Sequence, residues 1–230
     1  TQPTSTQKNF WIIYNIWHKF FIEKKLSFFY NILIVIIISF KIVAITATIF
    51  LFYNYFGETD MAIEYALILI KPDGVKKSLT GNVLSKLSQT GFHIIGSKVL
   101  KVSRELASEH YRHLKGKPFF EGVIDYIQGK TFGGAPYDRV FAFVYKGENA
   151  IAKLREIVGA TNPESAEPTT IRGSYGRISK DGTMENVVHC SSDINDAKRE
   201  IQLWFNPSEL TEEIYPTKKE TVTEEKIMWA

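Results

Sequence analysis

From residue 61 onward the sequence predicts an α/β (α+β) fold, a ferredoxin-like sandwich in which helices cover an antiparallel four-stranded sheet. Two observations predict it. Apolar runs of strand length alternate with amphipathic helical segments in the order β-α-β-α-α-β-α-loop-β-α. One connection, residues 159–185, is long and irregular, which is typical of a functional loop. With 44% hydrophobic residues, the chain can form a packed core.

The domain begins with a buried strand. Residues 65–70 form a continuous apolar run that ends before Pro72, which cannot donate a backbone hydrogen bond to a sheet. Thr80 can N-cap a helix with one apolar face, and Gly91 ends it. Residues 93–102 predict a second strand.

Two helices and a third strand come next. Ser103 can cap a helix that runs through His113, and residues 119–127 predict a further short helix. Residues 131–138 contain two glycines and a proline and predict a loop. Residues 140–145 then predict the third strand.

The last third of the domain contains the long connection. Residues 150–158 predict a helix, and 159–185 are expected to be irregular because glycine and proline recur there. Val187 and Val188 predict the end of a buried strand. A final helix is expected over about 194–205.

The composition changes near residue 61. Residues 1–60 are rich in Phe, Ile, Tyr, Asn and Lys, and Gly57 is their one glycine. Residues 61–206 have the composition of an ordinary soluble enzyme. Residues 207–230 form a charged tail that is expected to wrap the surface or stay loose, with Trp229 a candidate contact to a neighbour. We therefore expect a hydrophobic N-terminal extension, a globular domain and a tail.

The segment from Ile32 to Phe52 is long enough to span a bilayer. Lys41 near its middle costs about 2.5–3.5 kcal/mol on an insertion scale, which the surrounding apolar residues can offset. Lysines precede the segment and carboxylates follow it, so the positive-inside tendency would keep the N-terminus in the cytoplasm and export the domain. Hydropathy thus predicts a transmembrane helix with an unfavourable topology.

A second interpretation of residues 1–60 stays open. The chain begins with Thr1, and its first methionine is Met61. The residues that dominate the extension are those that A/T-rich codons encode. On this interpretation the extension is translated upstream sequence and the native protein starts at Met61. The native protein would then be cytoplasmic. A membrane partner is expected only if residues 28–53 are expressed.

Charge and motifs exclude several function classes. A net charge of +3 is too small to indicate a nucleic-acid partner. The single Cys190 excludes an internal disulfide and suits a reducing compartment. There is no zinc-type ligand spacing, no Gly-x-x-x-x-Gly-Lys-Ser/Thr loop and no protein-kinase signature. A phosphate site would need dispersed cations and hydroxyls, and the candidates are Lys71, Tyr111, Arg155, Thr161 and Arg172.

His189 is the candidate nucleophile. It lies between the apolar pair Val187-Val188 and a hydroxyl-rich turn, so it would emerge at a strand end. Taken alone, such a histidine is more often a hydrogen-bonded structural residue. The rest of the domain changes that interpretation.

Six short strings follow one another in a specific order. They are Lys71-Pro72-Asp73-Gly74, His110-Tyr111, Pro118-Phe119-Phe120, Thr161-Asn162-Pro163, Thr170-Ile171-Arg172-Gly173 and Leu203-Trp204-Phe205. Each string is common, but the ordered set over residues 62–206 resembles the nucleoside diphosphate kinase family. The resemblance implies the same ferredoxin-like fold.

The resemblance also implies roles for individual residues. His189 would accept the γ-phosphoryl group of a nucleoside triphosphate and pass it to a diphosphate, with Glu200 holding the other imidazole nitrogen. The remaining roles concern the nucleotide. Lys71, Arg172 and Tyr111 would stabilise the transferring group, Arg155 and Thr161 would hold the other phosphates, Asn186 would contact the ribose side, and Phe119 would stack on the base.

Cofactors and partners follow from the same resemblance. Mg²⁺ would be held mainly by the nucleotide phosphates, so no protein metal ligands are expected. The partners would be nucleoside triphosphates and diphosphates and further copies of the chain, as a hexamer or tetramer, and no nucleic acid is needed. The alternative function is a catalytically silent interaction or nucleic-acid-binding protein of the same fold.

The chain departs from the family pattern in three places. Cys190 stands where glycine or alanine is usual, and a thiol there could make activity sensitive to oxidation. Ser192-Asp193 stands where the family has Asp-Ser, which puts the contacts of that aspartate in doubt. The stretches 129–138 and 179–185 are longer than in compact members. None of these departures removes a residue with an assigned role.

Overall fold

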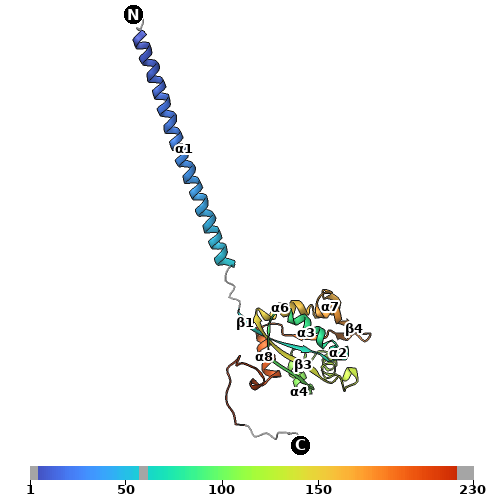
Figure 1. The fold of residues 1–230 in the computed structure, drawn as a ribbon. Coiled ribbons are helices and arrows are strands. Elements are labelled where there is room, and N and C mark those ends of the chain that lie inside the picture. Colours follow the sequence, from blue (N-terminus) through green and yellow to red (C-terminus); the bar gives the residue numbers. More distant parts are fainter. Residues whose placement is uncertain (1–4, 57–61, 222–230) are drawn as a thin grey trace. The chain divides into compact units, whose positions relative to one another are not determined.

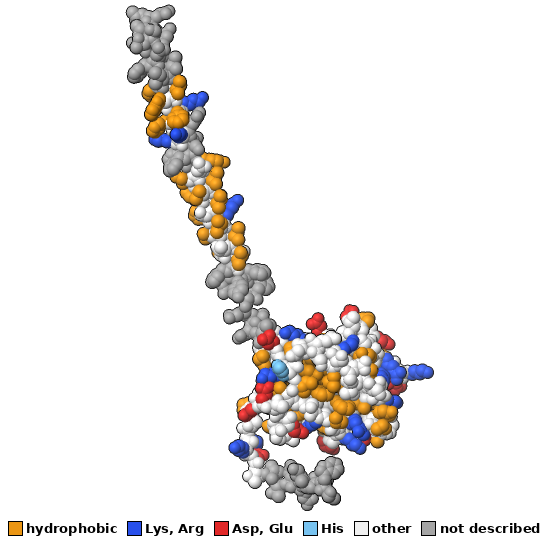
Figure 2. All heavy atoms as spheres, in the orientation of Figure 1, with side chains coloured by type: hydrophobic (Ala, Val, Ile, Leu, Met, Phe, Trp, Pro, Cys, Tyr) orange, Lys and Arg blue, Asp and Glu red, His pale blue; other side chains and the backbone are white. Residues whose placement is uncertain are grey.

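The computed structural model describes residues 5–56 and 62–221, and the chain divides between residues 60 and 61 into two units. The first unit is one helix, α1 (Ser5–Phe56). Within it, Tyr30–Ile49 is long and apolar enough to cross a membrane, judged by length and composition alone. All its side chains are exposed, and Figure 2 shows apolar side chains along this helix. The predicted start at Met61 and the predicted contact of Trp229 lie outside the described residues.

The second unit contains a four-stranded sheet (Figure 1). Its strands are β1 (Ile63–Ile70), β2 (His93–Leu100), β3 (Val140–Glu148) and β6 (Val188–Cys190). They lie in the order β2-β3-β1-β6, and every neighbouring pair is antiparallel. The predicted fold class is confirmed.

Helices cover both faces of this sheet, which explains the continuous apolar run in β1. Ile68 and Ile70 pack with α3 (Thr80–Ser88) and α6 (Ala150–Val158). Leu67 and Leu69 point the other way, into a second core. That core also receives side chains from α4 (Arg104–His110), α5 (Phe120–Ile127) and α8 (Ile194–Trp204). Because both faces of this strand are buried, its sequence does not alternate between apolar and polar residues.

Two of the predicted helix starts have different outcomes. Ser103 caps α4 as predicted, because its hydroxyl oxygen accepts from the Leu106 amide at 3.1 Å. The prediction for Thr80 was wrong: Leu79 is the N-cap residue and no side chain caps α3. Leu79 packs against the first core, and this packing places the helix start. A short helix that the sequence did not predict, α2 (Pro72–Lys76), starts at a proline, whose missing amide donor is tolerated there.

The long connection is less irregular than expected. It contains the turn η3 (Pro163–Ser165), the helix α7 (Ile171–Tyr175) and a hairpin of β4 (Arg177–Ile178) with β5 (Met184–Glu185). Three other single-turn 3₁₀ segments are η1 (Arg112–Leu114), η2 (Lys130–Phe132) and η4 (Pro207–Glu209). The segment η2 lies partly in the predicted loop.

The strand that carries His189 starts later than predicted. Val187 has a φ of 67°, in the left-handed region, so it forms a turn and the strand starts at Val188. His189 is therefore the middle residue of β6, opposite Leu69 of β1. The expectation that it follows the strand end was wrong.

Residues 209–212 of the tail lie along β2 and β3. The Thr211 amide donates to the Ile95 carbonyl at 2.8 Å, and Leu210 fills the space beside Gly96, where a Cβ would come within 2.6 Å of it. Glu209 pairs with Lys98 at 2.6 Å. Residues 209–215 thus pack on the domain surface, one of the two outcomes expected for the tail, whereas residues 216–221 are exposed.

Candidate active site

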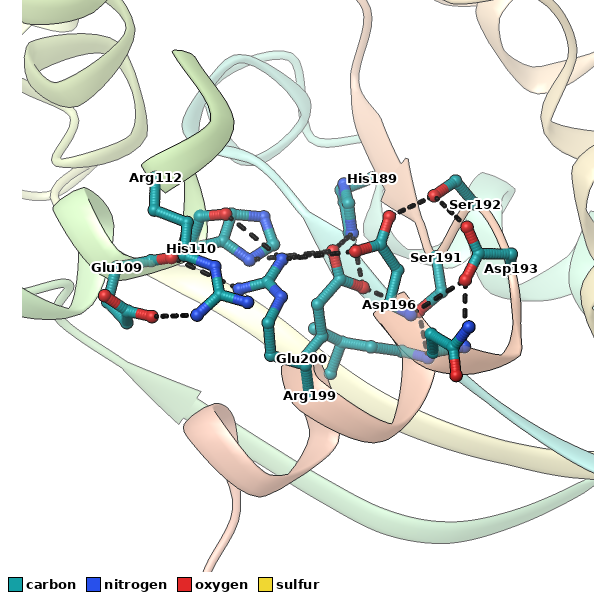
Figure 3. Close-up of polar contacts among 12 residues, drawn as sticks. Glu109, His110, Arg112, His189, Ser191, Ser192, Asp193, Asp196, Arg199 and Glu200 are labelled. Carbon is teal, nitrogen blue, oxygen red and sulfur yellow. Dashed lines mark hydrogen bonds and ion pairs between the residues drawn. The ribbon is translucent and has the colours of Figure 1, made fainter. Parts of the chain in front are cut away.

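His189 and Glu200 meet between β6 and α8 (Figure 3). The His189 Nε2 atom lies 3.0 Å from the Glu200 carboxylate. The same carboxylate accepts a hydrogen bond of 2.6 Å from the Ser191 hydroxyl, which in turn accepts from the Leu67 amide of β1 at 3.0 Å. The glutamate is thus fixed to the sheet as well as to the imidazole, which holds the ring in one orientation.

Burial sets the protonation of this pair. The His189 pKa lies well below its usual value, first because the ring is largely withdrawn from solvent, its side chain being 17% exposed, and then because Lys71 and Arg172 are close. Burial also raises the pKa of Glu200. At neutral pH the imidazole is neutral, and its one N–H faces the carboxylate through Nε2. Nδ1 therefore keeps its lone pair, as a nucleophile requires.

The side chain of His110 packs beside His189 and Glu200. It is 1% exposed, and its ring meets that of His189 edge to face at 4.5 Å between centroids. The Trp204 indole N–H donates to His110 Nδ1 at 3.1 Å, so this nitrogen is an acceptor. His110 Nδ1 lies 3.9 Å from the Glu200 carboxylate, and because this nitrogen is an acceptor the two groups do not form an ion pair. Burial keeps the pKa of His110 well below its usual value, so the ring is neutral.

The ligand atoms of His110, His189 and Glu200 lie within 4.8 Å of one another, close enough to suggest a metal centre. The surroundings favour the carboxylate–imidazole pair instead. The Lys71 and Arg172 cations lower the His189 pKa, and the same positive potential disfavours a second cation. The Trp204 bond also occupies the His110 nitrogen that would bind the metal.

Lys71 and Asn186 form a second contact of the site. The lysine ammonium donates to the Asn186 side-chain oxygen at 2.6 Å, and the amide nitrogen donates to the Thr161 carbonyl at 2.8 Å. Burial, and then Arg172, lower the pKa of Lys71 to about 7, while Asp73 acts in the opposite direction. An anion bound here would favour the charged lysine.

Arg172 joins α7 to β6, the strand of His189. Its Nε and Nη2 donate to the Val188 carbonyl at 3.3 and 3.0 Å, and its Nη1 donates to the Gly159 carbonyl at 2.9 Å. Thr170 caps α7 by accepting from the Gly173 amide at 3.1 Å. Burial lowers the Arg172 pKa to about 10, so the guanidinium is charged at neutral pH.

The other predicted residues are placed less tightly. Tyr111 is buried at the end of α4, and burial raises its pKa, so the phenol is protonated. Phe119 is 56% exposed, and Arg155 and Thr161 are also exposed. The structure brings His189, Glu200, Lys71, Asn186 and Arg172 together through direct contacts or shared backbone. The roles of all the predicted site residues, buried or exposed, stay predictions.

The departures around His189 are accommodated by local hydrogen bonds. Asp193 caps α8 by accepting from the amides of Asn195 and Asp196 at 2.8 and 2.9 Å, and Ser192 bonds to the Asp196 carboxylate. Cys190 is 3% exposed, and burial raises the pKa of its thiol to about 12. A protonated, buried thiol is a poor nucleophile, so the expected sensitivity to oxidation is not favoured.

Sequence reasoning gave no role to three residues that the structure places in the site. Ser191 bonds to Glu200, His110 packs on His189, and Asp73 accepts from the Val187 amide at 2.8 Å. Asp73 and His110 do stand in the strings that carry the resemblance, and Asp73 is also a charged residue between a proline and a glycine just after a buried strand.

Residues 64–210, which include every residue of this site, match the sequence profile of nucleoside diphosphate kinase. The chain belongs to this family. Two curated nucleoside diphosphate kinases illustrate the likeness. That of Carboxydothermus hydrogenoformans is 44% identical over 148 residues, which are 64% of this chain and 91% of the relative. That of Synechococcus elongatus is 42% identical over 151 residues, 65% of this chain and 93% of the relative.

Solved structures of the family agree with the fold. The nucleoside diphosphate kinase of Aquifex aeolicus superposes with a TM-score of 0.57 at 33% identity, covering 65% of this chain and 99% of its own. That of Borrelia burgdorferi, solved as a transition-state mimic with vanadate and ADP, gives 0.58 at 30% identity, covering 70% and 95%. Membership of the family makes the chain a phosphotransferase.

Proposed function

We propose that this chain transfers the γ-phosphoryl group from a nucleoside triphosphate to a nucleoside diphosphate through a phosphohistidine at Nδ1 of His189. The observation that carries the proposal is the contact of 3.0 Å between Nε2 and Glu200, which leaves Nδ1 with its lone pair beside two cations. The relative with bound vanadate and ADP supports this class of substrate.

The two half-reactions balance without a proton donor. The Nδ1 lone pair forms the N–P bond while the bond to the leaving oxygen breaks, and the diphosphate departs with that electron pair. The ring becomes cationic, and the Glu200 carboxylate stabilises it through the retained Nε2 proton. A terminal phosphate oxygen of the acceptor then attacks phosphorus, and the N–P electrons return to His189. This order of events gives ping-pong kinetics.

The cations and donors around His189 would stabilise the transferring group. Lys71 and Arg172 approach from α2 and α7, and the protonated Tyr111 supplies a hydroxyl donor. The other phosphates would be held by Arg155 and Thr161. Asn186 would contact the ribose side while bonded to Lys71, and the exposed ring of Phe119 would stack on the base.

The donor set fits Mg²⁺ carried by the nucleotide. Glu200 is engaged by His189 and Ser191, and one oxygen of Asp73 by the Val187 amide. The groups proposed to meet the phosphates are cations and hydroxyls, which bind phosphate rather than metal. When bound, Mg²⁺ would neutralise part of the phosphate charge. Lys71, Arg172 and Arg155 would hold the phosphates that carry it.

The test is labelling followed by a chase. The protein is incubated with Mg²⁺ and γ-labelled ATP, and unlabelled GDP is then added. We expect acid-labile, base-stable label that moves to GTP. It should be absent from His189→Ala and unchanged in His113→Ala, a matched change at an exposed histidine. A folded wild-type protein that binds nucleotide but takes no label would refute the proposal and favour the silent binding protein.

We also propose that residues 61–206 are the catalytic domain and that it works as a homo-oligomer, a hexamer or tetramer. The edge strand β2 exposes Ile94 and Val99, by 45% and 52%, which suits contact with another protein surface. Light scattering during gel filtration tests this, and a monomer at micromolar concentration would refute it.

For localisation we propose the cytoplasm, with membrane attachment through Tyr30–Ile49 wherever α1 is present. In that segment Thr46 and Thr48 donate their hydroxyl protons to helix carbonyls, so neither needs water. Carbonate extraction of the full chain and of a chain starting at Met61 measures attachment. Protection of the domain from protease on the cytoplasmic side would contradict the proposed location.

A further inference from the structure

The turn before the catalytic strand is held in an unusual conformation. Val187 is fully buried and has a φ of 67°, although a β-branched side chain disfavours this region. The Val188 amide closes the turn by donating to the Asn186 carbonyl at 2.7 Å. Such a residue keeps this conformation when its surroundings hold it there.

The segment after β1 supplies that support. The Val187 amide donates to Asp73 Oδ2 at 2.8 Å, and the Val187 carbonyl accepts from the Lys71 amide at 2.8 Å. Both backbone polar groups of Val187 are thus bound by residues 71–73. Gly74 allows this close approach, because a Cβ there would lie 3.0 Å from the Val187 side chain and 3.2 Å from its carbonyl oxygen.

We propose that Asp73 is a positioning residue for phosphoryl transfer. Its carboxylate holds Val187 in the turn that directs Asn186 to Lys71 on one side and starts β6 with His189 opposite Leu69 on the other. The inference rests on the proposed function of His189. It adds a residue that touches neither nucleotide nor nucleophile and acts through the backbone between them.

The geometry also indicates which property of Asp73 matters. The residue is fully buried, and its Oδ1 has no hydrogen-bond partner among the described residues. The Tyr126 hydroxyl likewise lacks a partner in the described part of the chain, and the pKa of that hydroxyl is raised by burial and by Asp73, so the two groups are close. Asparagine at position 73 would keep an oxygen for Val187, and its NH₂ would be placed to donate to the oxygen of the nearby Tyr126 hydroxyl. The required feature is therefore an acceptor at Oδ2.

Single-turnover labelling of His189 at saturating ATP tests the proposal. Asp73→Ala should slow labelling at least about tenfold, as expected when a buried amide loses its acceptor. Asp73→Asn should stay within about threefold of wild type. The assay is run at mildly acid pH, because Lys71 has a pKa of about 7 and loses a neighbouring charge in both variants. Asp125→Ala, at an exposed carboxylate paired with Lys130, is the matched control and should label normally.

Amide hydrogen exchange gives a readout that does not depend on activity. The Val187 amide should be protected in wild type and Asp73→Asn and exchange faster in Asp73→Ala, with β1 and β3 amides unchanged. Wild-type labelling by Asp73→Ala, or equally slow labelling by both variants, would overturn the proposal. If Asp73→Ala does not fold, a loss beyond about tenfold in Asp73→Asn overturns it. An unlabelled wild type refutes the proposed function, whereas an unchanged Val187 exchange rate in Asp73→Ala refutes the role of Asp73.

Discussion

Replacing Glu200 with glutamine should slow phosphorylation of His189 about tenfold. The carboxylate lies 3.0 Å from Nε2 and is buried, so its bond to the developing imidazolium is charge-assisted and poorly screened. A hydrogen bond to a charged group contributes about 1.5–3 kcal/mol, against about 0.5–1.5 kcal/mol for a neutral one. The difference of about 1.4 kcal/mol corresponds to a factor of ten in rate.

The assay is rapid-quench labelling from γ-labelled ATP at saturating concentration. Glu156→Gln, an exposed glutamate on α6, is the matched control and should leave the rate unchanged. ADP affinity should be unchanged in Glu200→Gln, because the glutamate acts on the imidazole and not on the nucleotide. A rate within twofold of wild type, with an unchanged melting temperature, would refute the orienting role.

The pH dependence sharpens this test. Burial raises the pKa of Glu200, so the carboxylate is protonated at a higher pH than an ordinary glutamate. Its advantage over glutamine is present above that pKa and is lost as pH falls through it. The rates of wild type and Glu200→Gln should therefore converge towards acid pH. A ratio that stays constant down to the acid limit of folding would show that the charge does not matter.

Three further outcomes are expected. Phe119→Ala should weaken binding of all nucleoside diphosphates by about 1–3 kcal/mol, because stacking contacts the face of a base and does not distinguish one base from another. Titration calorimetry that showed a loss of affinity for one base alone would contradict this prediction. Leu210→Ala should lower the free energy of unfolding by about 1–2 kcal/mol without changing turnover. The expected loss is smaller than for a full core truncation because this side chain is half-buried. An unchanged unfolding midpoint in urea would mean that the tail does not pack on β2. Removing Mg²⁺ with EDTA should abolish labelling of His189 and leave the melting temperature unchanged, and a large drop in that temperature would indicate a structural metal.

Local patterns predicted the elements whose causes are local. The strand at 65–70 could be recognised because burial on both faces leaves an unbroken apolar run. Ser103 caps a helix through a bond to a residue three positions away. Thr80 offered the same signal, but the packing of Leu79 against the core decided where that helix begins.

The turn at Val187 could not be predicted, because its cause lies elsewhere in the chain. Two valines in a row favour a strand, yet Asp73, 114 positions earlier, bonds to the Val187 amide and stabilises the turn. The same holds for the site. The resemblance indicated His189 and Glu200, and the structure confirms their contact. The hydrogen bonds of Ser191 to Glu200 and of Asp73 to the Val187 amide could not be predicted, because they depend on the three-dimensional arrangement and not on sequence spacing.

The proposed nucleophile, His189, lies on a three-residue strand at the margin of the sheet, with one neighbouring strand, β1. On its open side, where a further strand would supply donors, the Arg172 guanidinium bonds to the Val188 carbonyl. The Arg172 side chain thus satisfies a strand carbonyl that the backbone of a further strand would otherwise satisfy. The β4–β5 hairpin of the long connection is a separate sheet, so its length can change without breaking any strand pairing of the main sheet. The reactive centre can in this way stay constant while the segment beside it changes length.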